Sequence, residues 1–187
     1  MTLGKWKVPQ VKITVSVIPP QGLSLPFSLD EAWLEKAFGE FGDKVTCSHP
    51  VHVLCEVRKT GSTVVIQGSV TTQLVLPCAR CLEPAELNID TEFRYVMVPQ
   101  PSGYGSDVEL SPEDIEYGYY AEDCIDLLPL VYEQISLQIP MVVLCREDCK
   151  GICPHCGRNL NLGPCSCRED EVDIRWSVLK NLRIEKR

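Results

Sequence analysis

Six cysteines crowd into one short stretch of this chain, CREDCKGICPHCGRNLNLGPCSC, which runs from Cys145 to Cys167. Glycines and prolines interrupt the stretch, and few of its residues are apolar. Because so little apolar surface could be buried there, the segment needs cross-links to become ordered. Disulfides and a bound metal are the two kinds of cross-link that cysteines supply.

Three features of the whole chain favour metal. The opening stretch, MTLGKWKVPQVKITVSV, has neither the apolar core nor the cleavage site of a secretory signal, and no apolar run is long enough to cross a bilayer. We therefore expect a cytoplasmic protein, and in a reducing cytosol clustered thiols bind metal more often than they form disulfides. The odd total of eleven cysteines also argues against complete pairing. Thiolate ligands favour zinc first and an iron–sulfur cluster second.

The downstream cysteines predict one four-sulfur site. The sequence Cys153-Pro-His-Cys156-Gly is typical of a zinc knuckle. Cys165 and Cys167 form a C-x-C pair, and alternate residues of an extended strand point the same way, so both sulfurs could face one ion. These four cysteines would close a tetrahedral site.

A second four-sulfur site is predicted from the remaining pairs. Cys78 and Cys81 form a C-x-x-C, and Cys145 and Cys149 are four residues apart. Combining the pairs would staple the cysteine-rich segment to the rest of the chain, although Cys149 could instead serve the downstream site. A redox C-x-x-C is the alternative for Cys78 and Cys81, but that motif normally opens a helix in a βαβ unit. Three cysteines are left over and are expected to be small apolar residues: Cys47, Cys55 and Cys124.

The first part of the chain reads as a β-sheet. Apolar and polar residues alternate over several segments, which predicts strands with one polar face and hence an antiparallel sheet. The predicted strands cover residues 11–17, 45–57, 64–76 and 85–97. The last two flank residues 77–84, PCARCLEP, which places the C-x-x-C pair at the tip of a hairpin.

Three helices are expected beside the strands. Ser28 or Asp30 could cap a short one, and Asp126 could cap a longer one that Pro140 ends. Apolar residues recur every fourth position along the longer helix, so it should lie across the sheet. The third helix is expected to run from about Asp173 to the C-terminus.

These elements predict an α+β fold: an antiparallel sheet or partly open barrel with a few packed helices and a C-terminal cysteine-rich zinc-knuckle region. We expect two domains. Residues 1–144 would form the β-rich domain with its C-x-x-C hairpin, and residues 145–187 the zinc-binding segment with the last helix packed on it.

Net charge limits the possible partners. The formal charge of −8 argues against nucleic-acid binding by bulk electrostatics. The charge is uneven, because residues 1–144 carry a net −10 and residues 145–187 a net +2. Among catalytic motifs, there is no Gly-rich phosphate loop, no G-x-S-x-G and no H-E-x-x-H. Closed four-cysteine sites also indicate structure rather than catalysis, so we expect a protein that is not an enzyme.

Several segments together resemble the YceD family, the large ribosomal RNA subunit accumulation proteins of bacteria and plastids. They are PCARCLEP at 77–84, CIDLLPLVYEQISLQIPMVVLC at 124–145, CREDCKGICPHCGRNLN, CSC, and DIRWSVLKNL at 173–182, where Ile174 replaces the usual proline. The resemblance implies a role in the accumulation of large-subunit (23S-type) ribosomal RNA, hence in ribosome assembly.

We therefore expect a ribosome assembly factor that binds an rRNA precursor or a ribosomal protein through a zinc-stapled face. The phosphate contacts are assigned to basic residues near the cysteines: Arg80, Arg146, Lys150, Arg158 and Arg168. Simple solvation, or pairing with nearby carboxylates, is the alternative for these side chains. Because residues 1–144 are acidic, a basic ribosomal protein is also a candidate partner.

Two other functions stay open at this point. A thiol-dependent oxidoreductase or nuclease would need reactive, low-pKa cysteines. An iron–sulfur electron-transfer protein would be brown. Neither a membrane nor a small-molecule substrate is indicated by the sequence.

Overall fold

The computed structural model describes residues 11–39, 45–100 and 117–167. Its body is a six-stranded sheet in which β2, β4, β5, β6 and β7 lie in that order, with β3 paired to β5 beside this path. The strands are β2 (Leu23–Leu29), β3 (Thr46–Cys47), β4 (Val51–Thr60), β5 (Thr63–Pro77), β6 (Pro84–Pro99) and β7 (Tyr117–Tyr120). A separate antiparallel pair joins β1 (Lys12–Thr14) to β8 (Cys124–Asp126).

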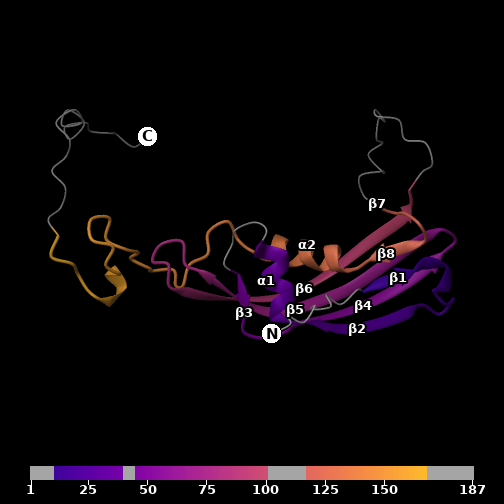
Figure 1. Ribbon diagram of the computed structural model, residues 1–187, viewed down its shortest axis with the longest axis horizontal. Helices are drawn as coiled ribbons and strands as arrows, with labels where there is room; N and C mark the ends of the chain where they lie inside the picture. The colour runs from indigo at the N-terminus through magenta and orange to yellow at the C-terminus, as the bar shows by residue number, and fades with distance from the viewer. Residues whose placement is uncertain (1–10, 40–44, 101–116, 168–187) are drawn as a thin grey trace, which may run out of the picture.

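The longest feature of the molecule is the hairpin of β5 and β6. Their antiparallel register runs from Val64 opposite Met97 to Pro77 opposite Pro84, at the tip. The alternation that predicted strands over 64–76 and 85–97 is confirmed, because alternate side chains of β5 are buried on one face. In Figure 1 the hairpin tip lies to the left of the helices, and the cysteine-rich segment, in orange and yellow, extends farther left beyond it.

The sheet is mixed, which corrects the prediction of a purely antiparallel one. Strand β7 pairs with β6 in parallel, with Val96 opposite Tyr117. A parallel neighbour needs a crossover of a dozen or more residues, and the stretch between Pro99 and Tyr117 is long enough to supply it. The α+β class itself agrees with the structure.

Prolines explain two further differences from the predicted strands. Strand β2 was not predicted because Pro26 interrupts its sequence, LSLPFSL. Among the strands that the structure describes, β2 lies at the edge of the sheet beside β4, where a missing N–H is tolerated. The strand predicted over 45–57 is broken before Pro50 into β3 and β4. The strand predicted over 11–17 is shorter, because a 3₁₀ turn, η1 (Val15–Val17), follows β1.

The two described helices have different N-terminal contacts. In α1 (Glu31–Gly39) the Asp30 carboxylate accepts a hydrogen bond from the Trp33 N–H at 3.0 Å, so Asp30 rather than Ser28 is the cap. In α2 (Leu128–Gln138) Leu127 occupies the cap position, and the predicted cap, Asp126, belongs to β8. The Asp126 carboxylate still accepts the Leu128 N–H at 3.1 Å. The helix predicted from about Asp173 lies outside the described residues.

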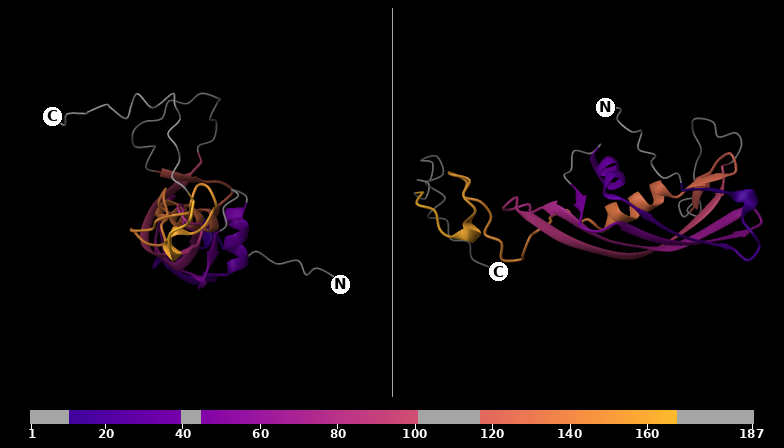
Figure 2. Two further views of the ribbon diagram at one scale, coloured as in Figure 1. Left: turned by 90° about the vertical axis from the view of Figure 1, so that its left-hand side faces the viewer. Right: turned by 60° about the horizontal axis from the view of Figure 1, so that its bottom comes forward.

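Both helices lie on the same side of the sheet, as the right-hand view of Figure 2 shows, and their buried apolar residues pack in one core with those of the strands. The core between them includes Leu34 of α1, Ile66 of β5 and Ile135 of α2, all with no exposed surface. Hydrophobic burial against the sheet therefore stabilises this part of the molecule. No helix in the described ranges is both long and apolar enough to cross a membrane.

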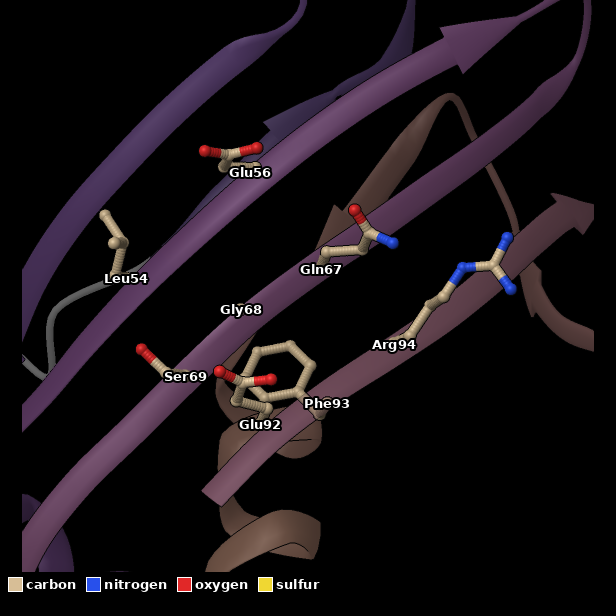
Figure 3. A pocket seen from close by; sticks show the side chains of 8 residues that line it. All are labelled: Leu54, Glu56, Gln67, Gly68, Ser69, Glu92, Phe93 and Arg94. Atoms are coloured by element: carbon tan, nitrogen blue, oxygen red, sulfur yellow. The ribbon is translucent and has the colours of Figure 1, made fainter. Parts of the chain in front are cut away.

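The opposite face of the sheet is polar and carries a shallow hollow of about 510 Å³ (Figure 3). Its walls include Glu56 of β4 and Glu92 and Arg94 of β6. Phe93 lies on the helix-covered side, where a Cβ at Gly68 would come within 2.7 Å of its ring. Neither cysteine nor histidine lines this hollow, so it offers no thiolate or imidazole ligand for a metal.

Candidate metal centres

The tip of the β5–β6 hairpin is a tight turn that points two thiols the same way. The Cys78 N–H donates to the Glu83 carbonyl at 2.8 Å, and the Leu82 N–H donates to the Cys78 carbonyl at 2.9 Å. Leu82 closes the turn with a φ of 62°, in the left-handed region that normally favours glycine. This geometry gathers Cys78 and Cys81 at the end of the sheet.

The same turn is built a second time in the cysteine-rich segment. The Gly157 N–H donates to the Cys153 carbonyl at 2.9 Å, and Gly157 has a φ of 69°. Cys153 and Cys156 therefore stand in the relation that Cys78 and Cys81 have at the hairpin tip. The second turn has glycine at the left-handed position, where the first has leucine.

The first cluster joins the hairpin tip to the start of the cysteine-rich segment. The sulfurs of Cys78, Cys81, Cys145 and Cys149 all lie within 4.8 Å of one another, with 3.8 Å between Cys78 and Cys149 and 3.6 Å between Cys81 and Cys145. A tetrahedral ion with metal–sulfur bonds of about 2.3 Å would separate its ligands by about 3.8 Å. These four thiols could therefore hold a metal ion.

The second cluster is local to the cysteine-rich segment. The sulfurs of Cys153, Cys156, Cys165 and Cys167 also lie within 4.8 Å of one another, with 3.4 Å between Cys153 and Cys165. Only Cys153 is buried. The structure thus brings together the same two sets of four thiols that the spacing indicated, whereas metal binding and the identity of the metal stay predictions.

Backbone contacts fasten the cysteine-rich segment to the hairpin around the first cluster. The Ala79 N–H donates to the Val143 carbonyl at 2.8 Å, and the Ile152 N–H donates to the Arg80 carbonyl at 3.2 Å. Gly151 has a φ of 75°, and a Cβ there would lie 3.0 Å from the Arg80 carbonyl oxygen. Glycine at position 151 therefore permits this close approach.

Arg80 adds a side-chain contact to the same junction. Its guanidinium donates to the Cys149 carbonyl at 2.9 Å and to the Glu147 carbonyl at 3.4 Å. The predicted contact of Arg80 with phosphate stays a prediction. In the structure its guanidinium instead binds backbone carbonyls of the cysteine-rich segment. It ties the two halves of the first cluster together.

Hydrogen bonds favour the thiolate form of one cysteine in each cluster. Burial raises the pKa of Cys78, but backbone N–H groups of Cys145, Arg80 and Cys81 outweigh it and lower the pKa to about 6. Hydrogen bonds from the backbone of Cys156 and His155 likewise lower the pKa of Cys153 to about 6. Thiolate is the form of cysteine that binds a metal, so each cluster holds at least one thiol whose hydrogen bonds favour that form. In the absence of a metal the opposite holds for one thiol of each cluster: burial raises the pKa of Cys145 to about 12, and the hydrogen bond with Cys156 raises the pKa of Cys167 to about 12.

An asparagine that the sequence did not single out also contacts the first cluster. The side-chain amide of Asn161 donates to the Cys149 sulfur at 3.3 Å, and this bond lowers the pKa of Cys149. Asn161 has no motif around it that would mark it as a partner of a thiol. Its position between the two cysteine pairs of the second cluster is the one signal that the sequence offered.

Of the other basic residues predicted to contact phosphate, three lie on the surface and one lies outside the residues that the structure describes. Arg146 pairs with Asp148 at 3.4 Å, which is the carboxylate pairing that stood as an alternative to a phosphate contact. Lys150 and Arg158 are exposed, and within the ranges that the structure covers no ion pair is recorded for either. Arg168 lies outside the described residues.

The three remaining cysteines take no part in either cluster. Cys55 is fully buried in β4, and burial raises its pKa to about 11, so it behaves as the small apolar residue that was expected. Cys47 and Cys124 are half-buried. All eleven cysteines are free thiols in the structure.

Fold and site together define an α+β protein in which a long hairpin and a cysteine-rich segment share a candidate metal centre. A family model described as "Large ribosomal RNA subunit accumulation protein YceD" matches residues 66–183, well over half of the chain and the whole of both clusters. The chain belongs to the YceD family, which confirms the resemblance noted in its motifs.

Individual relatives agree with this assignment. An uncharacterised protein of Mycobacterium tuberculosis is 29% identical over 123 residues, which cover 66% of this chain and 57% of the relative. A protein of Arabidopsis thaliana named large ribosomal RNA subunit accumulation protein YCED homolog 1, chloroplastic, is 27% identical, with 72% of this chain and 49% of the relative covered. The uncharacterised YlbN of Bacillus subtilis is 25% identical, with 83% and 87% covered.

The chain thus spans 57% of the length of the mycobacterial relative and about half of the plant one. No solved structure matches the chain.

Proposed function

We propose that this protein is a non-enzymatic ribosome assembly factor that promotes the accumulation of large-subunit ribosomal RNA. Membership of the YceD family and the name of the plant relatives, large ribosomal RNA subunit accumulation protein, support this role. Zinc in both cysteine clusters would hold the cysteine-rich segment against the hairpin, and the surface around them would bind rRNA or a ribosomal protein.

The closed geometry of the clusters is the observation that most favours binding over catalysis. Each set of four sulfurs would fill the coordination shell of a tetrahedral zinc ion, leaving no position for a substrate or an activated water. Arg80 and the backbone contacts beside it stabilise the same junction. A rigid surface at the end of the sheet is what such an arrangement supplies.

Two exposed cations at this end are suited to contact a phosphate backbone. Lys150 and Arg158 both lie in the cysteine-rich segment and are open to solvent. Phosphate contacts of this kind orient a protein on RNA without reading its sequence. The acidic balance of residues 1–144, net −10, would instead attract a basic ribosomal protein.

Depletion of the protein from its own cells tests the role itself. We expect large-subunit rRNA to decline while small-subunit rRNA stays near its normal level, as measured by quantitative RNA electrophoresis. An equal decline of both, or no decline, would contradict an assembly role for the large subunit.

Charge reversal tests which partner is bound. In the Lys150→Glu/Arg158→Glu variant, binding to large-subunit rRNA fragments should weaken roughly tenfold or more, and the salt dependence should become shallower by about one unit of slope per lost phosphate contact. Arg58→Glu/Arg94→Glu changes the net charge equally but alters the sheet face. Equal loss in both variants would exclude a specific RNA surface, and unchanged binding to basic ribosomal proteins would then favour the protein partner.

A thiol oxidoreductase is the second candidate, and the low pKa of Cys78 and Cys153 is the observation that favours it. Thiolates of this kind attack disulfides when they are free. The metal-loaded protein should then react rapidly with iodoacetamide at these two positions. Protection of both thiols until a chelator is added would exclude this activity, and a brown colour with bound iron would indicate an iron–sulfur protein instead.

A further inference from the structure

We propose that Asn161 is a positioning residue that couples the two cysteine clusters, so that metal in the second cluster strengthens metal binding in the first. The inference rests on metal occupancy of both clusters, which is part of the proposed function. It goes beyond that function because metal binding at one cluster would then depend on metal binding at the other.

The orientation of the Asn161 amide is fixed by its neighbours. Its carbonyl oxygen accepts a hydrogen bond from the Lys150 N–H at 2.8 Å. Because that oxygen is held by a backbone donor, the amide nitrogen must face the other way, toward the Cys149 sulfur at 3.3 Å. Asn161 therefore contacts both the ligand Cys149 and the residue that follows it.

Asn161 is carried by a loop that the second cluster closes. It lies in the 3₁₀ turn η3 (Leu160–Leu162), between the Cys156 and Cys165 ligands of that cluster. The Asn159 side chain caps the turn by accepting the Asn161 N–H at 3.0 Å. Figure 1 shows this turn at the lower left, in the yellow part of the chain beyond the hairpin tip.

Two further bonds hold the loop against the first cluster. The Leu160 N–H donates to the Gly151 carbonyl at 2.9 Å. The Asn159 amide donates to the Glu83 carboxylate, at the base of the hairpin turn, at 3.4 Å. The loop therefore bridges the ligands of the second cluster and the protein groups surrounding the first.

Because of this placement, the coupling would arise from the conformational entropy of the loop that carries Asn161. With metal in the second cluster, both ends of the loop are fixed, and Asn161 reaches Cys149 at little further cost. Without that metal the loop must be ordered before the amide can reach the sulfur, so part of its contribution is lost. Linkage is reciprocal, and metal in the first cluster must favour the second by the same factor.

The test uses the full chain loaded with cadmium-113, which gives one NMR signal for each cluster; Cys78→Ser assigns the first. Loss of each signal is followed after addition of a chelator. In Asn161→Ala the first cluster should bind metal about 10- to 100-fold more weakly, the usual range for loss of an outer hydrogen bond to a ligand, and should release it correspondingly faster. Asn88→Ala, a surface asparagine on β6, is the matched control and should match the wild type.

Asn161→Asp separates the two roles of the side chain. It keeps the oxygen that accepts the Lys150 N–H but replaces the donor with a second anionic oxygen beside the sulfur. We expect release from the first cluster at least as fast as in Asn161→Ala. Wild-type release in Asn161→Asp would overturn the inference, because only the loop contact would then matter.

Dismantling the second cluster tests the coupling directly. Cys165→Ser/Cys167→Ser should speed release from the first cluster, and Asn161→Ala should have a smaller effect in that background than in the wild type, since the loop that carries Asn161 is then no longer fixed at both ends. If Asn161→Ala and Cys165→Ser/Cys167→Ser each speeded release by the same factor whether alone or together, the coupling would be overturned, although metal binding by the two clusters of the wild type would not. A wild-type chain that binds no metal would overturn the metal premise itself, and a wild-type chain with both signals but no effect of Asn161→Ala would overturn only this inference.

Discussion

The sheet body and the cysteine-rich end of this molecule are held together in different ways. In the body, α1 and α2 bury the apolar face of the sheet in one large hydrophobic cluster. At the end, the buried cluster consists of Cys78, Cys81, Ala85 and Cys149, so three of its four members are thiols. Figure 2 shows this end extending past the part of the sheet that the helices cover.

The difference follows from composition. A segment rich in glycine, proline and charge cannot bury enough apolar surface to offset the entropy of ordering its backbone. Metal–thiolate bonds could supply that free energy locally, with few residues. One chain thus combines a region stabilised by buried apolar area with a region that a few metal–thiolate bonds could stabilise. Core substitutions should unfold the first region, whereas removal of the metal should unfold the second.

The largest expected effect is a selective loss of the cysteine-rich end. In Cys78→Ser/Cys81→Ser the bound metal should fall by one ion per chain, because the first cluster loses two ligands from the hairpin. Native mass spectrometry measures the ion count. Hydrogen exchange should become fast at the Ala79 and Ile152 amides, which bond across the junction, and stay slow in β4 and β5.

Cys124→Ser is the control for that variant, since Cys124 is half-buried and belongs to neither cluster. Its metal content should equal that of the wild type. Retention of the full metal complement by Cys78→Ser/Cys81→Ser would show that the hairpin thiols are not ligands.

The converse experiment weakens the body and spares the end. Ile135→Ala empties a fully buried site under α2 and should lower the free energy of unfolding by about 3 kcal/mol. Urea unfolding followed by circular dichroism measures this change. Leu137→Ala, on the same helix but 68% exposed, should cost less than about 0.5 kcal/mol.

Metal content should be unchanged in both helix variants. If Ile135→Ala released metal as readily as it unfolded the sheet, the two regions would form one cooperative unit and the distinction between them would be lost.

The smallest effect concerns the two equivalent turns. Leu82 adopts the left-handed conformation that Gly157 adopts in the second turn. Leu82→Gly should therefore stabilise the hairpin turn by up to about 1 kcal/mol, and Gly157→Leu should destabilise its own turn by a similar amount. A Cβ at Gly157 would have no atom within 4 Å, so the first side-chain atom adds no clash to the backbone strain.

Chelator-induced metal release from each cluster measures both substitutions. Faster release from the first cluster in Leu82→Gly would contradict the strain argument. It would show instead that the Leu82 side chain, which is 67% exposed, supports the turn.

The sequence predicted well wherever a regular pattern or a fixed chemical requirement was present. Alternation located β5 and β6, and the need for four ligands per tetrahedral ion sorted eight cysteines into the sets that the structure brings together. Family membership followed from the same motifs. The expected division at residues 144 and 145 stays a proposal.

The rest depended on contacts that no local pattern encodes. Pro26 concealed β2, because its tolerance depends on the strand being at an edge, which only the assembled sheet determines. The parallel pairing of β7 with β6 depends on a long-range crossover. Asn161 and the carbonyl contacts of Arg80 could not be predicted because each depends on where a distant backbone segment comes to lie.

The hairpin also sets a distance. Strand β5 has 15 residues, which at about 3.3 Å per residue extend about 50 Å. The first cluster lies at one end of this span and the β4–β5 turn at Gly61 at the other. Partners touching the two ends would be held up to about 50 Å apart. Two extra residues in each strand would lengthen the span by about 7 Å and keep every side chain on its face, whereas one extra residue would invert all those beyond it.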